Sequence, residues 1–409
     1  MKEKAASGVW RRSEFRAYMS ATAFAGISFS MHQLLVSWLF IGILLLPADR
    51  VGQLQALIGI PGVFLMLWGG VSADRTDSRA LLIRVYAIAP LLPMALIVFD
   101  QVDRISVSTV TLWGLGMSVV MSFSSPAQQA ILNRVTGSAV QHGVTVATAT
   151  LFLVQIVGLT VAGQMDRVGL TPVLLVQASS LAMAAWMIRR VSASPPSHGA
   201  DTGPVWRQVV EGLKAVHADK VVFNVLVLNF VSSVFNAGAF LTVFPFIVKR
   251  IYRGDAALLA AMMVLFFAGA MVSNLAMLRW MPFAHPGRLF LVMQLSRIAI
   301  LLLLWIEPSW WLLVVATVSW GLNMGVTSTL ARSIVQESAA PGFRGRVLSV
   351  FSVGQIGSAP IGALVLGWII EAFGTLNALL PAMLTSLVLF LFGTLATGVW
   401  SYRSPVPDG

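Results

Sequence analysis

Long apolar runs alternate with short polar stretches along almost the whole chain. Ten runs contain no charged residue: Ala17–Leu46, Val51–Ala73, Ile105–Asn133, Gly143–Met165, Val168–Ile188, Val221–Val248, Ala256–Leu278, Ser309–Ala331, Val347–Ile370 and Thr375–Trp400. Two more, Ala80–Phe99 and Leu289–Ile306, are each interrupted by one arginine. Because a spanning helix needs roughly 20 predominantly apolar residues, the pattern predicts twelve transmembrane helices.

The runs are too long and too uniformly apolar for transmembrane strands, which alternate in polarity over about ten residues. The composition agrees, since 57% of the 409 residues are hydrophobic and 11% are charged. A soluble domain carries about 25% charged residues. The first run is longer than the apolar core of a signal peptide and is not followed by a convincing processing site, so we expect it to be retained. The sequence therefore predicts an all-α membrane protein.

The basic residues predict an orientation. If the N-terminus is cytoplasmic, 20 of the 27 lysines and arginines fall on the cytoplasmic side and six on the other, with Arg297 inside a span. An excess of Lys and Arg in cytoplasmic loops is typical of membrane proteins. We therefore expect both termini to be cytoplasmic.

The longest hydrophilic interval, about 189–220, separates six spans from six. Within it Trp206–Val216 alternates polar and apolar residues at helical spacing, which favours an amphipathic helix on the membrane surface. The predicted organisation is a six-helix bundle at 1–190, a cytoplasmic linker at 191–220 and a second bundle at 221–409. A weak repeat, Ala130–Asn133 against Ser333–Gln336, supports two related halves.

The most specific motif is Gly69–Leu82, in the short loop after the second span. It contains Gly70, the pair Asp74-Arg75 and a further basic residue, Arg79. This segment resembles the loop signature of the major facilitator superfamily. The resemblance implies two six-helix bundles that open a central path to alternate sides of the membrane, and it gives the four residues a role in gating.

Three further segments, Pro126–Leu132, Val210–Lys214 and Gly345–Gly367, are similar to the branch that contains the enterobactin exporter and macrolide-efflux proteins. This resemblance implies a monomeric secondary transporter in the bacterial cytoplasmic membrane, which exports small amphiphilic molecules such as drugs or siderophores. Two departures leave proton coupling open. The antiporter motif expected in span five is degraded at Gly158–Gly163, and the second loop signature, around Arg279–Arg288, lacks its Asp-Arg pair.

Polar residues form stripes on the spans that line the central path in this fold. Span one has Ser30, Gln33 and Ser37 with His32 beside them; span seven has Asn229, Ser232 and Asn236; span ten has Trp320, Asn323 and Thr327; spans five and eleven have Gln155 and Gln355. Polar groups that face lipid are costly, so we expect these stripes to point inward. They either contact substrate or bond helix to helix.

Two ionisable side chains lie deep in the predicted spans. His32, with an ordinary pKa near 6.5, is either a proton carrier or a buried neutral histidine, since a pKa of about 6.5 permits either state near neutral pH. Arg297 either binds an anionic substrate group or packs against neighbouring helices, because intramembrane charge is costly and often functional.

Several other classes of function are disfavoured. The chain has no cysteine, no clustered metal ligands and no phosphate-binding Walker loop, so we expect no cofactor, no metal and no enzyme activity. The net charge of +11 is spread over many loops, which argues against nucleic-acid binding. The alternatives that stay open are an importer or facilitator of a metabolite, a channel, and a receptor on the same fold.

The loop signature generates the first testable prediction. A carboxylate that faces a helix N-terminus gains about 0.3–1 kcal/mol from the helix dipole, and we expect Asp74 to face the start of span eleven near Gly345. A contact made in one conformation shifts the equilibrium toward that conformation. Asp74→Asn should lower transport in an efflux assay while expression and membrane insertion stay normal. Unchanged transport would contradict this gating role.

Overall fold

The computed structural model describes residues 12–136, 140–193, 219–281, 283–339 and 344–404, together with positions 210, 214, 216 and 217. Within its helices, the side chains at 67, 70–75, 133, 140–146, 148–149, 278 and 344–346 are not described. All regular secondary structure in the described residues is helical, as the apolar pattern predicts.

The first six predicted spans are all present as helices. They are α2 (Ser13–Trp38) continued by η1 (Leu39–Ile43), α3 (Ala48–Arg75), α4 (Ser78–Ile88) with α5 (Leu91–Gln101), α6 (Val107–Thr136), α7 (Val140–Ala162) followed by the short α8 (Met165–Val168), and α9 (Leu170–Ile188). Pro90 lies at the break between α4 and α5, where it separates two halves of one span. Proline disrupts the backbone hydrogen bonding of a helix, which explains this break.

The second six predicted spans are also helical. They are α11 (Lys220–Gly238), continued by η3 (Ala239–Val243), α12 (Phe244–Phe246) and η4 (Ile247–Ile251), then α13 (Ala256–Trp280), α14 (Pro286–Trp305), α15 (Trp310–Ser338), α16 (Arg344–Phe373), and η5 (Asn377–Leu379) with α17 (Leu380–Leu395). Among the described residues, eleven of the predicted spans are long and apolar enough to cross a membrane. The twelfth, predicted at Val51–Ala73, coincides with the 28-residue helix α3.

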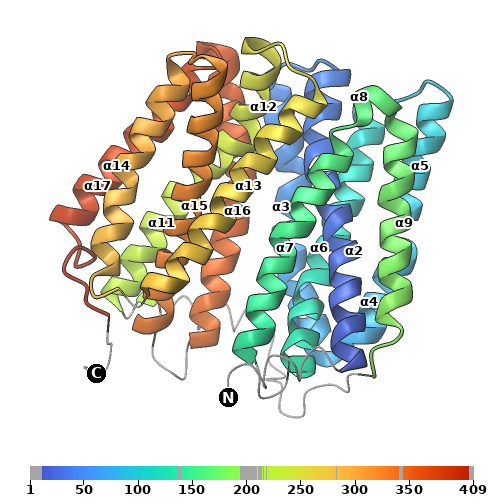
Figure 1. Ribbon diagram of the computed structural model, residues 1–409, viewed down its shortest axis with the longest axis horizontal. Coiled ribbons are helices and arrows are strands. Elements are labelled where there is room, and N and C mark those ends of the chain that lie inside the picture. Colours follow the sequence, from blue (N-terminus) through green and yellow to red (C-terminus); the bar gives the residue numbers. More distant parts are fainter. Residues whose placement is uncertain are drawn as a thin grey trace. The chain divides into compact units, whose positions relative to one another are not determined.

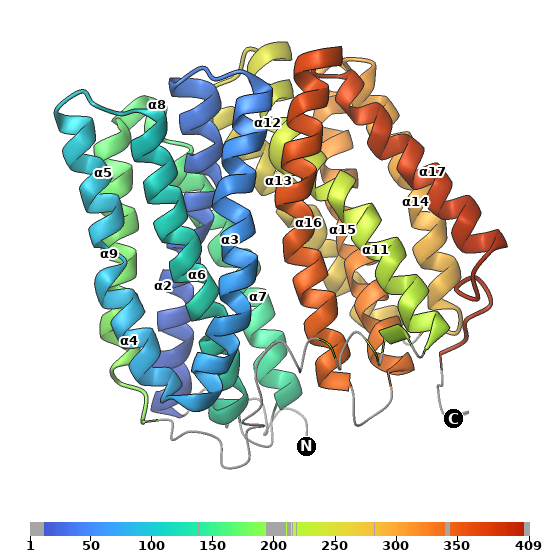
Figure 2. The ribbon, with the colours of Figure 1, turned by 180° about the vertical axis from the view of Figure 1, so that it is seen from behind.

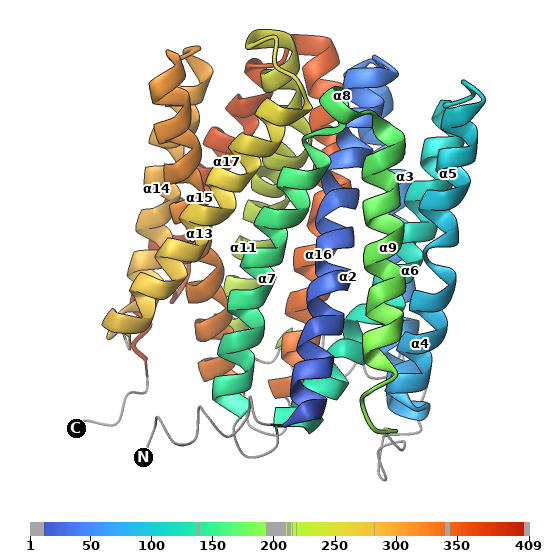
Figure 3. The same ribbon diagram turned by 45° about the vertical axis from the view of Figure 1, so that its right-hand side comes forward.

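Close contacts group the described residues into two units. Unit 1 takes those within 1–45, 57–202 and 254–264, and unit 2 those within 46–56, 203–253 and 265–409. In unit 1, α2 lies between α7 and α9, as Figures 1 and 3 show. In unit 2, α11 packs along α16, and α14 contacts both α15 and α17 (Figure 2). The predicted bundle boundaries stay a prediction, and most of the predicted linker helix lies outside the described residues.

The two halves share an irregularity that the sequence pattern does not reveal. Span one changes to π-helix at Leu39–Ile43, and span seven does so at Ala239–Val243, 200 residues later. A second π-helical turn follows in span seven at Ile247–Ile251. Such turns are rare and are often found at functional sites. Their matched positions support the interpretation of spans one and seven as counterparts.

Glycines allow α11 and α16 to pack with their backbones in contact. A Cβ atom on Gly362 would lie 2.0 Å from the carbonyl oxygen of Val234, and one on Gly238 would lie 2.7 Å from the backbone of Gly362. Small residues of this kind let membrane helices approach closely. The core of unit 2 therefore depends on the absence of side chains at these two positions.

This close packing predicts the effect of a single methyl group. Gly362→Ala should lower the free energy of unfolding by about 1–3 kcal/mol, the usual cost of an overpacked core. Gly354→Ala, on the same helix, is a matched control, because its new Cβ would meet only the Phe230 ring at 3.6 Å. Thermal unfolding of the two purified variants measures the difference. Equal midpoints for the two variants would contradict the prediction.

Candidate functional site

In unit 1, Gln155 of α7 connects two polar residues of α2. Its Oε1 accepts a hydrogen bond from the Ser30 hydroxyl at 3.1 Å, and its Nε2 donates to Oε1 of Gln33 at 2.8 Å. Gly158, one turn further along α7, lets the helices approach, since a Cβ there would lie 2.5 Å from the carbonyl oxygen of Ile27. The structure thus brings together residues that the sequence placed on spans one and five.

His32 faces a different helix from Gln33. Its ring meets the ring of Trp113 on α6 edge to face, with centroids 4.6 Å apart. His32 is 7% exposed, and neither its Nδ1 nor the Nε1 of Trp113 has a hydrogen-bond partner among the described residues. The sequence pattern did not single out Trp113, because one tryptophan within an apolar span does not by itself indicate a contact with His32. Ser37, the last residue of the stripe, is buried.

Unit 2 contains two comparable pairs. Nδ2 of Asn229 on α11 donates to Oε1 of Gln355 on α16 at 2.9 Å, and Nε1 of Trp320 on α15 donates to Oδ1 of Asn236 at 2.7 Å. An indole N–H only donates, so Asn236 must accept through its oxygen and presents its amide nitrogen elsewhere. These pairs join the polar stripes of spans seven, ten and eleven.

Trp320 is fully buried within an aromatic group that the sequence analysis did not single out. The rings of Phe240, Phe244 and Phe266 lie edge to face with it, at centroid distances of 5.6, 5.9 and 5.8 Å. Phe240 and Phe266 also stack on each other at 3.7 Å. In the sequence, only the cluster of phenylalanines in spans seven and eight could have indicated this aromatic group. The site in unit 2 is therefore aromatic as well as amidic.

Exposure separates the predicted site residues into two groups. Four carboxamide residues are partly accessible: Gln33, Gln155, Asn236 and Gln355. Five are buried: His32, Ser37, Asn229, Trp320 and Asn323. The first group is therefore partly accessible although its members also take part in hydrogen bonds between helices, and the second group is enclosed by the packed helices.

Arg297 of α14 is 2% exposed and is held by neutral oxygen atoms. Its Nε and Nη2 donate to Oδ1 of Asn323 at 3.3 and 3.2 Å, and its Nη1 donates to Oε1 of Gln294 at 2.9 Å. The hydroxyls of Ser232 and Thr327 accept two further bonds. All five N–H groups of the guanidinium therefore have partners.

The partners of Arg297 come from three helices of unit 2, α11, α14 and α15. Among the described residues no carboxylate forms an ion pair with it. Because its donors are already used, the hydrogen bonding favours the packing alternative over contact with an anionic ligand. Asn323, a predicted cavity residue, takes part in the same network and donates from Nδ2 to the carbonyl oxygen of Met293 at 2.7 Å.

The loop signature is described in part. Gly70, Asp74 and Arg75 lie in the last turns of α3, and their side chains lie outside the described residues. Arg79 follows the N-cap Asp77 of α4, and its Nη2 donates to the carbonyl oxygen of Arg189, just past the end of α9, at 2.8 Å. The described contact of Arg79 is therefore within unit 1.

The second half repeats this contact although its loop signature is degraded. Nε of Arg288, near the start of α14, donates to the carbonyl oxygen of Trp400 beyond α17 at 3.3 Å. Arg79 and Arg288 thus occupy equivalent places: each begins the third span of its half and bonds the backbone after the sixth. Cationic groups are favourable at the C-terminal ends of helices. The two arginines thus make the same kind of contact in both halves.

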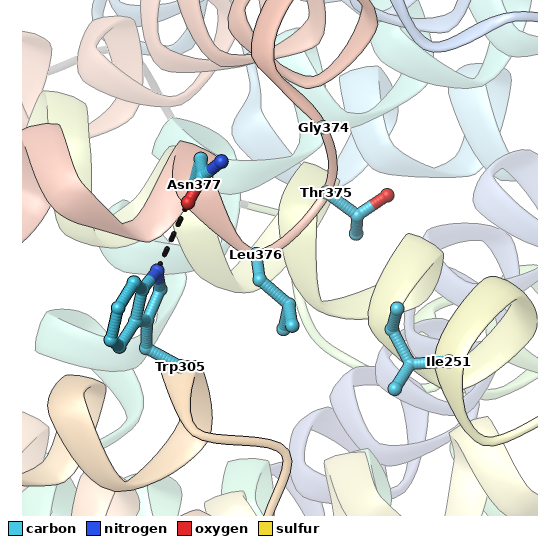
Figure 4. A pocket seen from close by; sticks show the side chains of 6 residues that line it. All are labelled: Ile251, Trp305, Gly374, Thr375, Leu376 and Asn377. Atoms are coloured by element: carbon cyan, nitrogen blue, oxygen red, sulfur yellow. Dashed lines mark hydrogen bonds between the residues drawn. The ribbon is translucent and has the colours of Figure 1, made fainter.

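A shallow pocket in unit 2 lies apart from the predicted cavity residues. Ile251, Trp305 and the segment Gly374–Asn377 line it (Figure 4). The indole Nε1 of Trp305 donates to Oδ1 of Asn377 at 3.1 Å, which ties α14 to η5 beside the pocket. None of the residues predicted from the polar stripes contributes to its lining.

The described helices, with polar residues paired between spans one and five and between their counterparts, spans seven and eleven, have the major facilitator fold of membrane transporters. The family model described as transmembrane secretion effector, a branch of that superfamily, matches residues 6–403. The chain belongs to this family. A comparison with curated proteins finds no match.

Solved structures share the fold at low sequence identity. The nucleoside transporter NupG, in a mutant form, superposes with a TM-score of 0.77 at 13% identity and covers 94% of this chain and 99% of its own. A bacterial homolog of the human lysosomal transporter Spinster, in an inward-facing and unoccupied conformation, gives 0.74 at 12% identity over 97% and 99%. A D-xylose-proton symporter gives 0.70 at 12% identity over 94% and 97%. At these identities the similarity shows the fold alone.

The network around Arg297 predicts a large loss of stability on its removal. Arg297→Leu leaves several buried oxygen atoms without a donor, at about 1–3 kcal/mol for each unsatisfied group. Arg84→Leu is the control, because Arg84 is the other arginine inside a span and is exposed. Thermal unfolding of the purified variants measures the effect. A stable Arg297→Leu variant with an altered preference between anionic and neutral substrates would contradict the packing role.

Proposed function

We propose that this protein is a secondary active transporter that exports small amphiphilic organic molecules, such as drugs or siderophores, from the cytoplasm. The observation that carries the proposal is the set of partly accessible carboxamides on four counterpart spans: Gln33, Gln155, Asn236 and Gln355. The description of the family as a secretion effector supports the outward direction, together with the resemblance of Gly345–Gly367 to exporters.

The chemistry of these residues favours molecules that are neutral or amphiphilic. Carboxamides donate and accept hydrogen bonds without charge. Asn236 has its oxygen engaged by Trp320, so its amide nitrogen is available to an acceptor on the substrate. The neighbouring aromatic rings of Phe240 and Phe266 supply apolar contact area. Ligand sites commonly combine predominantly apolar walls with a few placed polar groups.

We further propose that export is coupled to protons through His32. Its Nδ1 is buried without a partner among the described residues, beside the equally unpartnered indole nitrogen of Trp113. A histidine is the side chain whose charge changes most readily near physiological pH. The alternative, a histidine that stays neutral and packs against Trp113, predicts export without a response to a pH gradient.

The test is transport by purified protein in liposomes. Candidate drugs and siderophores are offered with and without an imposed pH gradient, and we expect movement of at least one compound that the gradient accelerates. Replacing Gln155 or Asn236 by leucine should raise KM about two- to tenfold, because a hydrogen bond contributes about 0.5–1.5 kcal/mol. Gln101→Leu is the control, since Gln101 is an exposed carboxamide at the end of α5 that bonds Thr171.

Two outcomes would overturn these proposals separately. Wild-type protein that moves none of the compounds outward, while folded and correctly inserted, would end the export proposal. Export that proceeds at the same rate with and without the gradient, or a His32→Ala variant with an unchanged response to it, would end the proton coupling through His32. Equal KM values for Gln155→Leu and Gln101→Leu would show that Gln155 does not contact the substrate.

A further inference from the structure

Two carboxylates bind the N-terminal ends of two spans that are distant from them in sequence. Oδ2 of Asp166 accepts a hydrogen bond from the backbone nitrogen of Ala256, the first residue of α13, at 2.7 Å. Oε2 of Glu371 accepts one from the backbone nitrogen of Ala48, the first residue of α3, at 3.1 Å. Asp166 follows span five and Glu371 lies near the end of span eleven, which are counterparts in the two halves.

Both contacts are electrostatically favourable. The first N–H groups of a helix have no partner within it, and they form the positive end of the helix dipole. Ala48 and Ala256 are both fully buried. Water therefore cannot replace the carboxylate while the helices remain packed, and an unpaired buried N–H is costly.

Each carboxylate also contacts one more side chain, which comes from span one for Asp166 and from span seven for Glu371. Nε1 of the buried Trp38 donates to Oδ1 of Asp166 at 3.1 Å. The guanidinium of Arg250 lies 3.7 Å from Oε2 of Glu371, and both of these side chains are nearly half exposed. Each carboxylate thus joins three helical segments, and the two sets follow the same plan although their third partners differ.

Glycines next to the carboxylates bring the helices together. A Cβ on Gly163 would lie 2.3 Å from the Cβ of Ala260 on α13, and one on Gly367 would lie 2.6 Å from the carbonyl oxygen of Ala48 on α3. These glycines precede Asp166 and Glu371 by three and four residues, or about one helical turn. Among the described residues, both halves therefore combine a close glycine contact with a capping carboxylate.

A local cap shows that the contact with Asp166 is not needed to start α13. Oδ1 of Asp255, directly before α13, already accepts from the backbone nitrogen of Leu258 at 2.8 Å. Asp219 caps α11 in the same local way. Asp166 is 90 residues from Ala256, and Glu371 is 323 residues from Ala48. Such long-range caps depend on tertiary packing, so they form or break with conformation.

Asp166 contacts α13 and Glu371 contacts α3, and these are the two helices whose residues are divided between the units. Residues 48–56 of α3 group with unit 2 and the rest of that helix with unit 1, whereas residues 256–264 of α13 group with unit 1 and the rest with unit 2.

We propose that Asp166 and Glu371 are a pair of latches, which hold the first turns of α13 and α3 in this conformation and release them when the transporter changes state. The proposal rests on transport by alternating conformations and not on the direction or the substrate.

Hydrogen–deuterium exchange on the purified full-length protein tests the latches directly. Asp166→Asn keeps an oxygen acceptor and removes the charge, so amides in residues 256–264 should exchange about two- to fivefold faster, as expected for the loss of about 0.3–1 kcal/mol. Glu371→Gln should have the same effect on residues 48–56. Asp166→Ala and Glu371→Ala also remove the acceptor and should show larger effects.

Asp100→Asn is the matched control. Asp100 is a carboxylate at the end of a span that accepts a hydrogen bond from the Thr171 hydroxyl at 2.6 Å. It should change exchange in neither segment. If the two latch variants leave exchange unchanged, or accelerate it to the same extent throughout the chain, the proposal is wrong, because the first result shows no latch and the second a general loss of stability.

The absence of natural cysteine allows an independent readout. Thr242→Cys reports on α3, because Thr242 is fully buried and its hydroxyl donates to Oε1 of Gln55 at 2.8 Å. Ala260→Cys reports on α13 beside Gly163. Labelling by a maleimide in detergent should accelerate at Thr242→Cys with Glu371→Gln and at Ala260→Cys with Asp166→Asn. Labelling that follows neither pairing would overturn the proposal, whatever the transport assay shows.

Discussion

The hydrocarbon interior of a membrane offers no hydrogen-bond partners, so a polar group that enters it is costly unless it is paired within the protein. This constraint explains why the described chain is helical throughout, since a helix pairs its own backbone. It also explains the arrangement of the polar side chains. Gln155 bonds Ser30 and Gln33, Asn229 bonds Gln355, and Trp320 bonds Asn236, so each stripe on one span meets a stripe on another.

Arg297 is the strongest case of the same rule. A buried charge without compensation is among the most expensive groups in a protein. Here four neutral side chains surround the guanidinium and supply oxygen atoms to all of its donors. The arginine consequently joins three helices of unit 2, and its charge is stabilised by oriented dipoles. A residue that stands out in the sequence as a functional candidate thereby acquires a structural explanation.

The ends of the spans follow a different rule, because helix termini leave backbone groups unpaired. Both halves solve this with charged side chains at matched places. Arg79 and Arg288 bond carbonyl groups beyond the sixth span of each half, and Asp166 and Glu371 bond amide groups at the starts of α13 and α3. The repeat that is weak in the sequence is thus clearer in the contacts.

The sequence by itself determined the class of protein, the helical spans and the polar stripes, because these depend on hydrophobic period and length, which are local properties. The hydrogen bond between Gln155 and Gln33 joins two of the polar stripes that the sequence predicted, whereas the partners of Arg297 and the position of Trp113 beside His32 did not follow from the pattern. Only the tertiary structure decided those contacts and the long-range caps formed by Asp166 and Glu371. The physical reason is that a hydrogen bond between helices depends on their rotation, height and separation, and no local periodicity encodes these three quantities.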